Sequence, residues 1–191
     1  MTLFKNKYRV ESVRLPGYDY SQPGAYYITI VVHNRQCLFG NVVDGKMMLN
    51  EFGELVKTEW LKTGVIRPNI DVDSFIVMPN HLHGILIITD NDNQRKDASQ
   101  CQRRDTSQRV STRMNEQFGK PTHNSIPTIV RLFKSTTTKQ INQIRKTPMQ
   151  PLWQRGYYEH VVRDEDDLNR IREYIINNLQ KWEFDKLNHL L

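Results

Sequence analysis

Cysteine and long apolar runs are both scarce in this chain. Its 191 residues include only two cysteines, Cys37 and Cys101, which are too few and too scattered for a disulfide framework or a zinc ribbon. No apolar run approaches the length that crosses a bilayer, and the first residues lack the apolar segment of a secretory signal. We therefore expect a reduced, cytoplasmic protein that has no membrane partner.

The composition suits one folded domain that spans residues 1–191. Hydrophobic residues make up 38% of the chain, enough for one substantial core at this length. The formal net charge is +6 and the sequence pI is about 9.3. A basic surface favours a polyanionic partner, and nucleic acid is the partner that we expect.

The composition changes abruptly at about residues 90–120. Between residues 91 and 117 the only apolar side chains are Ala98, Cys101, Val110 and Met114. Such a stretch buries too little surface to offset its ordering entropy, so we predict a flexible insert in the domain. Its Arg and Lys side chains could grip phosphates, or the segment could be an ordinary solvated loop of mixed charge.

Local patterns predict the elements of the rest of the chain. Residues 26–32 are rich in aromatic and β-branched side chains and predict a first strand, and the Asp44-Gly45 pair predicts a hairpin turn. Asn50 can cap a helix over residues 51–62 that ends at Gly64. A second helix is predicted over residues 126–145, a strand over 157–162, and a last helix capped by Asp164.

Two histidines alternate on a strongly apolar strand. Residues 78–83 read Met-Pro-Asn-His-Leu-His, and side chains two apart on a strand share a face, so His81 and His83 would lie side by side as part of a metal site. Alternating histidines on a half-exposed strand can also be ordinary polar-face residues. The apolar residues at 75–77 and 85–88 instead indicate a buried strand, where imidazoles need partners. Pro79 predicts two strands joined by a turn.

The strands and helices alternate as strand, helix, strand, strand, helix, strand, helix. This order predicts an α+β fold with an antiparallel sheet and helices packed on one face. A ferredoxin-like domain with an added C-terminal helix has this order of elements. The buried stripe of the last helix is predicted to consist of Leu168, Ile171, Ile175, Leu179 and Trp182.

The last helix carries two polar residues beside this stripe. Tyr174 and Asn178 are four residues apart, about 40° from one another around the helix axis, and can face one point beside the sheet. Taken alone, Tyr174 would be an amphipathic packing residue.

Basic and aromatic side chains elsewhere are candidates for nucleic-acid contacts. Arg131, Lys134 and Arg145 form one edge of the second helix, which either follows a nucleic-acid backbone or is a solvated edge. On strand 157–162, Tyr158 can pack or stack on a base, and His160 either contacts DNA or is structural. Tyr26 and Tyr27 in the first strand are interpreted as core residues rather than base-stacking ones.

Several segments together resemble one known family. The histidine motif is similar to that of the HUH single-strand endonucleases, and most of all to the REP-associated tyrosine transposases. The resemblance extends from about residue 15 to residue 182 and is poor at the insert. The other matching segments are 24–30, 49–53, 125–129, 153–160 and 170–178.

The resemblance implies an activity as well as a fold. It implies that Tyr174 is the nucleophile, that His81, His83 and Asn178 hold Mg²⁺ or Mn²⁺, and that single-stranded or hairpin DNA is cut through a 5′-phosphotyrosine. The ligand types alone would also allow Zn²⁺. Related proteins work as a monomer or as a homodimer. Members often have proline after the residue matching Asn178, whereas Leu179 stands here, so we expect the helix to continue.

Two other functions remain compatible with the sequence. One is a non-catalytic, single-stranded nucleic-acid-binding protein, since ferredoxin-like sheets with aromatic residues also serve for stacking. The other is a metal-dependent hydrolase in which water attacks and Tyr174 only orients the substrate.

Overall fold

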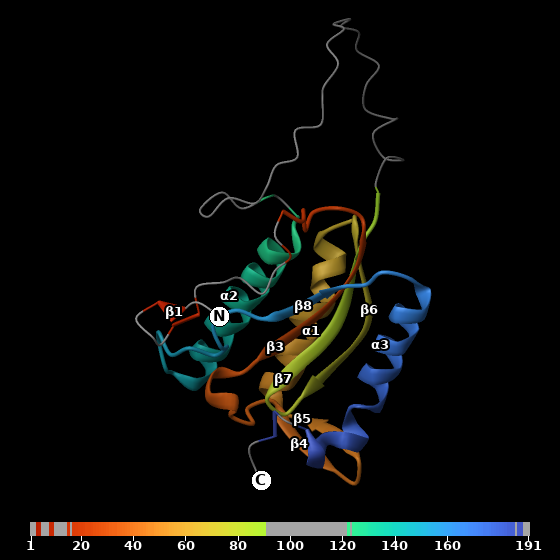
Figure 1. Ribbon diagram of the computed structural model, residues 1–191. Helices are drawn as coiled ribbons and strands as arrows, with labels where there is room; N and C mark the ends of the chain where they lie inside the picture. Colours follow the sequence, from red (N-terminus) through yellow and green to blue (C-terminus); the bar gives the residue numbers. More distant parts are fainter. Residues whose placement is uncertain are drawn as a thin grey trace, which may run out of the picture.

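The structure is a computed structural model, drawn in Figure 1. It describes residues 15, 17–90, 122, 124–185 and 187–188, together with the backbone of the paired short strands β1 (Leu3–Phe4) and β2 (Tyr8–Arg9). The insert predicted at 90–120 lies outside these residues from 91 onward. Within the described ranges, no helix combines the length and the apolar character needed to cross a membrane.

A four-stranded antiparallel sheet forms the centre of the domain. Its strands are β6 (Ile70–Met78), β7 (His81–Ile88), β3 (Gly24–Val31) and β8 (Tyr158–Val161), in this order across the sheet. Helix α1 (Glu51–Ile66) connects β3 to β6, and α2 (Ile126–Arg145) lies between β7 and β8 in the chain. This is the predicted ferredoxin-like α+β fold.

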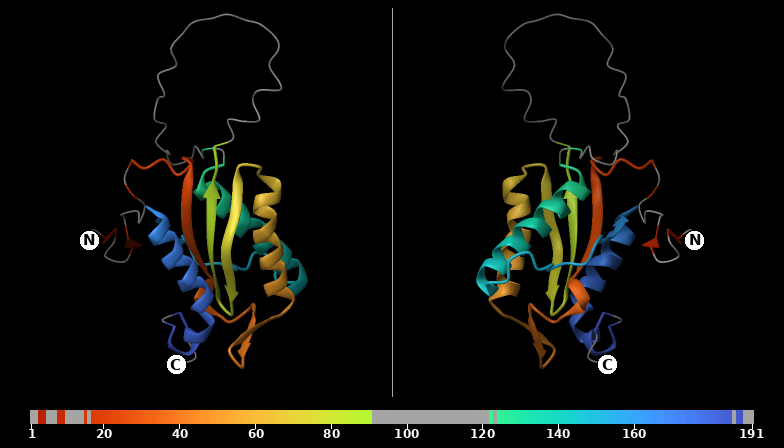
Figure 2. Two further views of the ribbon diagram at one scale, coloured as in Figure 1. Left: turned by 90° about the vertical axis from the view of Figure 1, so that its right-hand side faces the viewer. Right: turned by 90° about the vertical axis from the view of Figure 1, so that its left-hand side faces the viewer.

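The helices form two layers, one on each side of the sheet. Figure 2 shows α1 and α2 on one side and α3 (Glu165–Asn177) on the other. The larger core lies under α1 and α2 and includes Ile28, Leu82 and Leu86; the smaller one joins Tyr27 and Ile85 to the buried side of α3. The added C-terminal helix therefore covers the face of the sheet that α1 and α2 leave open.

The predicted turn and cap between β3 and α1 are present. Strands β4 (Gly40–Val43) and β5 (Lys46–Leu49) form a hairpin whose Asp44 and Gly45 both have positive φ, as its turn type requires. The Asn50 side chain accepts hydrogen bonds from the first-turn N–H groups of α1. The predicted end of α1 at Gly64 is wrong. The helix runs on to Ile66. Gly64 does not end it but instead lets the β6 backbone approach the helix closely at this point.

After α3 the chain forms a more tightly wound 3-10 helix and does not continue as an α-helix. Asp164 caps α3 by accepting from the Asp167 N–H at 2.8 Å, and α3 ends at Asn177. The expected continuation past Asn178 takes the form of a 3-10 helix, η2 (Leu179–Phe184), which buries Trp182 and is followed by Asp185.

Candidate active site

Strand β7 positions the two histidines on the face that α3 covers. Leu82 points into the core under α1 and α2, so the alternation of the strand turns His81 and His83 to the opposite side. Their ring centroids are 4.5 Å apart, and the two residues are 0% and 3% exposed. On β3, Thr29 is the register partner of His83.

One neighbour fixes the tautomer of His81. The Asn80 side-chain amide donates from Nδ2 to the carbonyl oxygens of Arg35, at 3.0 Å, and Leu187, at 2.7 Å, so its Oδ1 must be the atom that faces the imidazole. His81 Nδ1 lies 2.7 Å from this oxygen and therefore donates a proton to it. Nε2 is left with a lone pair and has no hydrogen-bond partner among the described residues.

Two hydroxyl groups hold His83. Its Nδ1 lies 2.7 Å from Tyr27 Oη and 2.8 Å from Thr29 Oγ1, and the Thr29 hydroxyl donates to Tyr27 Oη at 3.1 Å. Because Thr29 uses its proton on Tyr27, its lone pairs can accept from a protonated Nδ1. In that tautomer the buried Nε2, which also lacks a described partner, offers a lone pair.

The end of α3 brings Tyr174 to the histidines, and Asn178 follows it by one helical turn. The Tyr174 ring lies 5.4 Å from the His83 ring and 6.3 Å from the Tyr27 ring, measured between centroids. Tyr174 is 46% exposed, so it borders both the histidines and the solvent. Asn178 is buried and its side chain lowers the pKa of Tyr174, but its Oδ1 has no hydrogen-bond partner in the described part of the chain.

Asp185, which the sequence did not indicate, completes the cluster. Ligand atoms of His81, His83 and Asp185 all lie within 4.8 Å of one another. Asp185 Oδ1 accepts from the Leu187 N–H at 2.7 Å, while Oδ2 faces His81 Nε2 at 3.8 Å. Two imidazole nitrogens and a carboxylate oxygen can hold a divalent metal ion.

Burial sets the protonation states of the site. It lowers the pKa of His81 to about 3, and burial together with the charge of His81 lowers that of His83 to about 3. Both imidazoles are therefore neutral at pH 7, as metal ligands must be. Burial and the Asp185 charge raise the pKa of Tyr174, against hydrogen bonds from Asn178 and Tyr27 that lower it. The phenol is thus protonated at neutral pH.

The basic residues predicted on α2 lie on the other side of the sheet. Arg131 is exposed, and Arg145 donates to Asn142 Oδ1 at 2.6 Å. Lys134 donates to the carbonyl oxygens of Gln154, at 2.7 Å, and Gly156, at 2.8 Å, and burial lowers its pKa to about 8. Lys134 thus fastens α2 to the segment before β8. A DNA contact by any of the three remains a prediction.

The two β8 candidates have different surroundings. Tyr158 is 53% exposed and its ring lies 6.1 Å from that of Tyr27, so it borders the candidate site. His160 Nε2 lies 2.8 Å from Asp167 Oδ2 and joins β8 to α3. His160 and Arg170 lower the pKa of Asp167 to about 2. Tyr157 packs instead against the core under α1 and α2.

Four residues of this site escaped the sequence-based prediction of function: Tyr27, Thr29, Asn80 and Asp185. The alternation of β3 puts Tyr27 and Thr29 on one face, but only the register with β7 places that face beside His83. Asn80 belongs to the histidine motif and could have been included. No local pattern singles out Asp185.

Comparisons with known proteins identify a sequence relative that matches this chain over most of its length. No family model matches the chain. The chain is 38% identical over 176 residues to an uncharacterized protein of Haemophilus influenzae. The matched segment covers 92% of this chain and 91% of that protein.

Among solved structures, the chain is similar to the REP-associated tyrosine transposase bound to a REP hairpin. The TM-score is 0.57 at 16% sequence identity, over 93% of this chain and 77% of the other. The chain therefore belongs to one family with the Haemophilus influenzae protein and has the fold of the REP-associated tyrosine transposase.

Proposed function

We propose that this protein is a metal-dependent single-strand DNA endonuclease and strand transferase of the transposase type, with Tyr174 as its nucleophile. One observation carries the proposal. His81 Nε2, His83 Nε2 and Asn178 Oδ1 are buried without hydrogen-bond partners among the described residues, beside a half-exposed tyrosine. Buried polar atoms without a partner are costly, so three that lie near one tyrosine support a ligand that satisfies them.

The donor atoms fit a divalent cation. His81 and His83 would hold it through Nε2, Asp185 through Oδ2 and Asn178 through Oδ1, and we expect Mg²⁺ or Mn²⁺. When bound, the ion supplies positive charge that neutralises an oxygen of the scissile phosphate and orients the phosphate for in-line attack. Asn80 and Thr29 hold the opposite ring nitrogens and so orient both imidazoles for this role.

Tyr174 performs the covalent step. Its Oη attacks the phosphorus, the bond between phosphorus and the 3′-oxygen breaks, and the strand is left as a 5′-phosphotyrosine. The phenol loses its proton and the departing 3′-oxygen gains one. The phosphodiester energy stays in the tyrosyl bond, so a 3′-hydroxyl from another strand can reverse the step and join DNA without ATP. Asn178, one helical turn after Tyr174, would help to orient the phenol.

The proposed substrate is single-stranded DNA beside a hairpin. A tyrosine on a helix reaches a phosphate in line more easily when the strand is unpaired. The solved structural neighbour was bound to a REP hairpin, which supports a hairpin as the recognised feature. A non-catalytic stacking protein is less compatible with this fold, because α3 covers the sheet and leaves Tyr27 only 8% exposed.

Tyr174→Phe tests the proposal most directly. The protein is incubated with a labelled single strand next to a hairpin and Mn²⁺, and denaturing gels are used to look for a covalent protein–DNA adduct. We expect an adduct with the unaltered protein and none with Tyr174→Phe, since phenylalanine has no oxygen to attack phosphorus. DNA binding should persist, because the substitution removes one hydroxyl and phosphate contacts elsewhere dominate the affinity.

Tyr157→Phe and Tyr158→Phe are the matched controls. Tyr157 packs in the core on the other face and Tyr158 borders the site, and each should still form the adduct. Cleavage without any adduct would instead favour the hydrolase, in which water attacks. An adduct that survives in Tyr174→Phe and disappears in a control would place the nucleophile at Tyr157 or Tyr158 and refute the assignment.

A further inference from the structure

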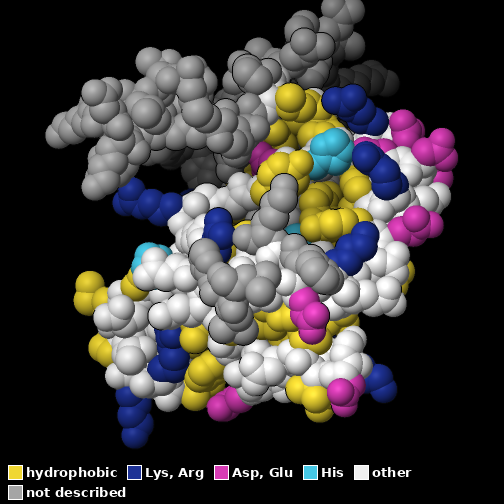
Figure 3. Space-filling view, turned by 60° about the horizontal axis from the view of Figure 1, so that its bottom comes forward, with side chains coloured by type: hydrophobic (Ala, Val, Ile, Leu, Met, Phe, Trp, Pro, Cys, Tyr) yellow, Lys and Arg dark blue, Asp and Glu magenta, His cyan; other side chains and the backbone are white. Residues whose placement is uncertain are grey.

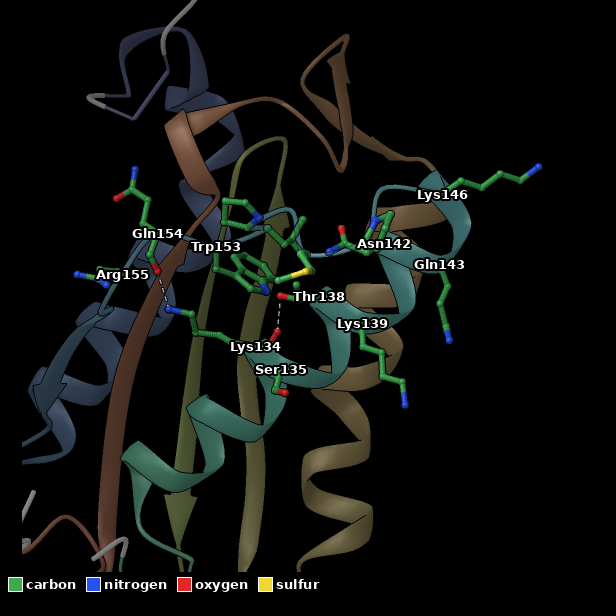
Figure 4. Close-up of a pocket in the computed structure, with 14 residues that line it drawn as sticks. Lys134, Ser135, Thr138, Lys139, Asn142, Gln143, Lys146, Trp153, Gln154 and Arg155 are labelled. Atoms are coloured by element: carbon green, nitrogen blue, oxygen red, sulfur yellow. Dashed lines mark hydrogen bonds between the residues drawn. The ribbon is translucent and has the colours of Figure 1, made fainter. Parts of the chain in front are cut away.

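A basic cavity lies away from the candidate active site, between α2 and the segment 146–155. Its volume is about 890 Å³, and its lining includes Lys134, Lys139, Lys146 and Arg155 but no carboxylate. Trp153 and Leu152 form a buried apolar floor. Figure 4 shows Lys139 and Lys146 on one side of Trp153 and Arg155 on the opposite side.

Hydrogen bonds hold the walls of the cavity in place. Trp153 Nε1 donates to Thr137 Oγ1 at 2.9 Å, which fixes the indole edge against α2. Asn142 Nδ2 donates to the Gln150 carbonyl at 2.8 Å, and Lys134 holds the far end of the segment through two carbonyl oxygens. The cavity is therefore built into the fold before any ligand arrives.

Three cations on the rim are available to a ligand. Lys139, Lys146 and Arg155 are exposed, and none forms an ion pair with a carboxylate of the described chain. Met149, at the same rim, is 98% exposed and has a φ of 65°, a conformation that non-glycine residues seldom adopt. An apolar floor with cations on opposite sides matches an unpaired base between two phosphates.

A second cavity adjoins the first one, toward the end of the sheet where β7 begins. It measures about 730 Å³, is lined by residues 33–35 and by Arg155 and Trp153, and thus shares a wall with the first cavity. The carbonyl oxygen of Arg35 accepts the Asn80 amide that orients His81. The end of the molecule with the β6–β7 turn faces the viewer in Figure 3, and Lys and Arg side chains lie at several places on it.

We propose that these two cavities form one groove for the single-stranded DNA that continues from the cleaved phosphate, an inference that rests on the proposed function. The strand leaves the histidines past residues 33–35, crosses Arg155 and places an unpaired base over Trp153. Lys139, Lys146 and Arg155 bind its phosphates, and Met149 packs against the base. The groove leads the strand around the end of the sheet, from the α3 side to the α2 side.

Salt-dependent binding of single strands of increasing length tests the groove. The full chain carrying Lys139→Gln with Lys146→Gln, and separately Met149→Ala, is titrated with labelled strands that share one cleavage site. For strands long enough to reach α2, we expect the double variant to bind about tenfold more weakly, with a salt slope lower by about 1.4 because two phosphate contacts are lost. Met149→Ala should weaken binding and leave the salt slope unchanged.

A control variant with the same loss of charge separates the groove from general electrostatics. Lys46→Gln with Lys57→Gln removes two exposed cations from the β4–β5 hairpin and α1, and should leave the binding curves unchanged. Equal weakening by both double variants, weakening for duplex DNA as well, or no change for long strands would overturn the groove. Cleavage by the unaltered protein is measured separately. If the protein binds long strands in this way but does not cut them, only the proposed function is refuted.

Discussion

The ion pair between Asp73 and Arg172 should decide how firmly α3, the helix that carries Tyr174, is attached to the sheet. Arg172 lies two residues before Tyr174 on α3. Its Nε and Nη2 donate to the two carboxylate oxygens of Asp73 at 3.1 and 2.6 Å. This pairing, together with hydrogen bonds from Ser74, lowers the pKa of Asp73 from 3.8 to about 2. Each pKa unit is worth about 1.4 kcal/mol, but solvent screens this partly exposed carboxylate, so we expect Asp73 to contribute about 1 kcal/mol at pH 7.

Asp73→Asn tests this value. For a chain of this size, a loss of about 1 kcal/mol should lower the melting temperature by about 2–4 °C at pH 7. The sign of the pH dependence follows from the lowered pKa. The stabilisation is complete above the unfolded pKa near 4 and is lost as the pH falls toward 2, so the difference between variant and unaltered protein should shrink over this window. Urea unfolding at several pH values measures it.

The control is Asp71→Asn, which removes an exposed carboxylate from the same strand and should change stability little. If Asp73→Asn were as stable as the control at pH 7, the pair would not anchor α3. A loss of stability that stayed constant down to pH 2 would refute the electrostatic explanation and leave only packing as its cause.

Three further substitutions probe the site and its support. His83→Ala should abolish metal-dependent cleavage and the thermal stabilisation by Mn²⁺, while gel-shift assays still detect hairpin binding; unchanged cleavage would rule the site out. Thr29→Val keeps the shape but removes the hydroxyl beside His83 Nδ1, and calorimetric titration should show Mn²⁺ affinity about 10–100-fold weaker. Gly84→Ala would place its Cβ 2.6 Å from the buried Trp60 ring and should destabilise the fold by about 1–3 kcal/mol in urea, whereas unaltered stability would mean that the ring can move aside.

The fold could be predicted because its signals are local. The Asn50 and Asp164 caps, the Asp44-Gly45 turn and the 3.6-residue stripe of the last helix each depend on residues a few positions apart. Together they yield the order of elements, and an antiparallel ferredoxin-like sheet is a known arrangement for this order. The end of α1 was predicted wrongly because Gly64 responds to a tertiary contact with β6 rather than to helix termination.

The candidate site could be predicted only in part, since half of it depends on distant contacts. The alternation of β7 indicated His81 and His83, and helical spacing indicated Tyr174 with Asn178. Thr29 is 54 residues from His83 in the chain, and only strand register brings it to the imidazole. The side on which α3 packs was likewise not encoded in its own stripe, because an amphipathic helix fits either face of a sheet.

The C-terminal 3-10 helix couples the proposed metal site to the position of Tyr174, the proposed nucleophile. Asn178 precedes η2 and Asp185 follows it, so both ends of this short helix carry a proposed ligand. The same segment returns to β7 through the Leu187 carbonyl, which accepts from Asn80, the residue that orients His81. A cation held by His81, His83, Asn178 and Asp185 would therefore join β7 to the end of α3. Because Tyr174 lies one helical turn before Asn178, filling the metal site and fixing the phenol beside it would be one event.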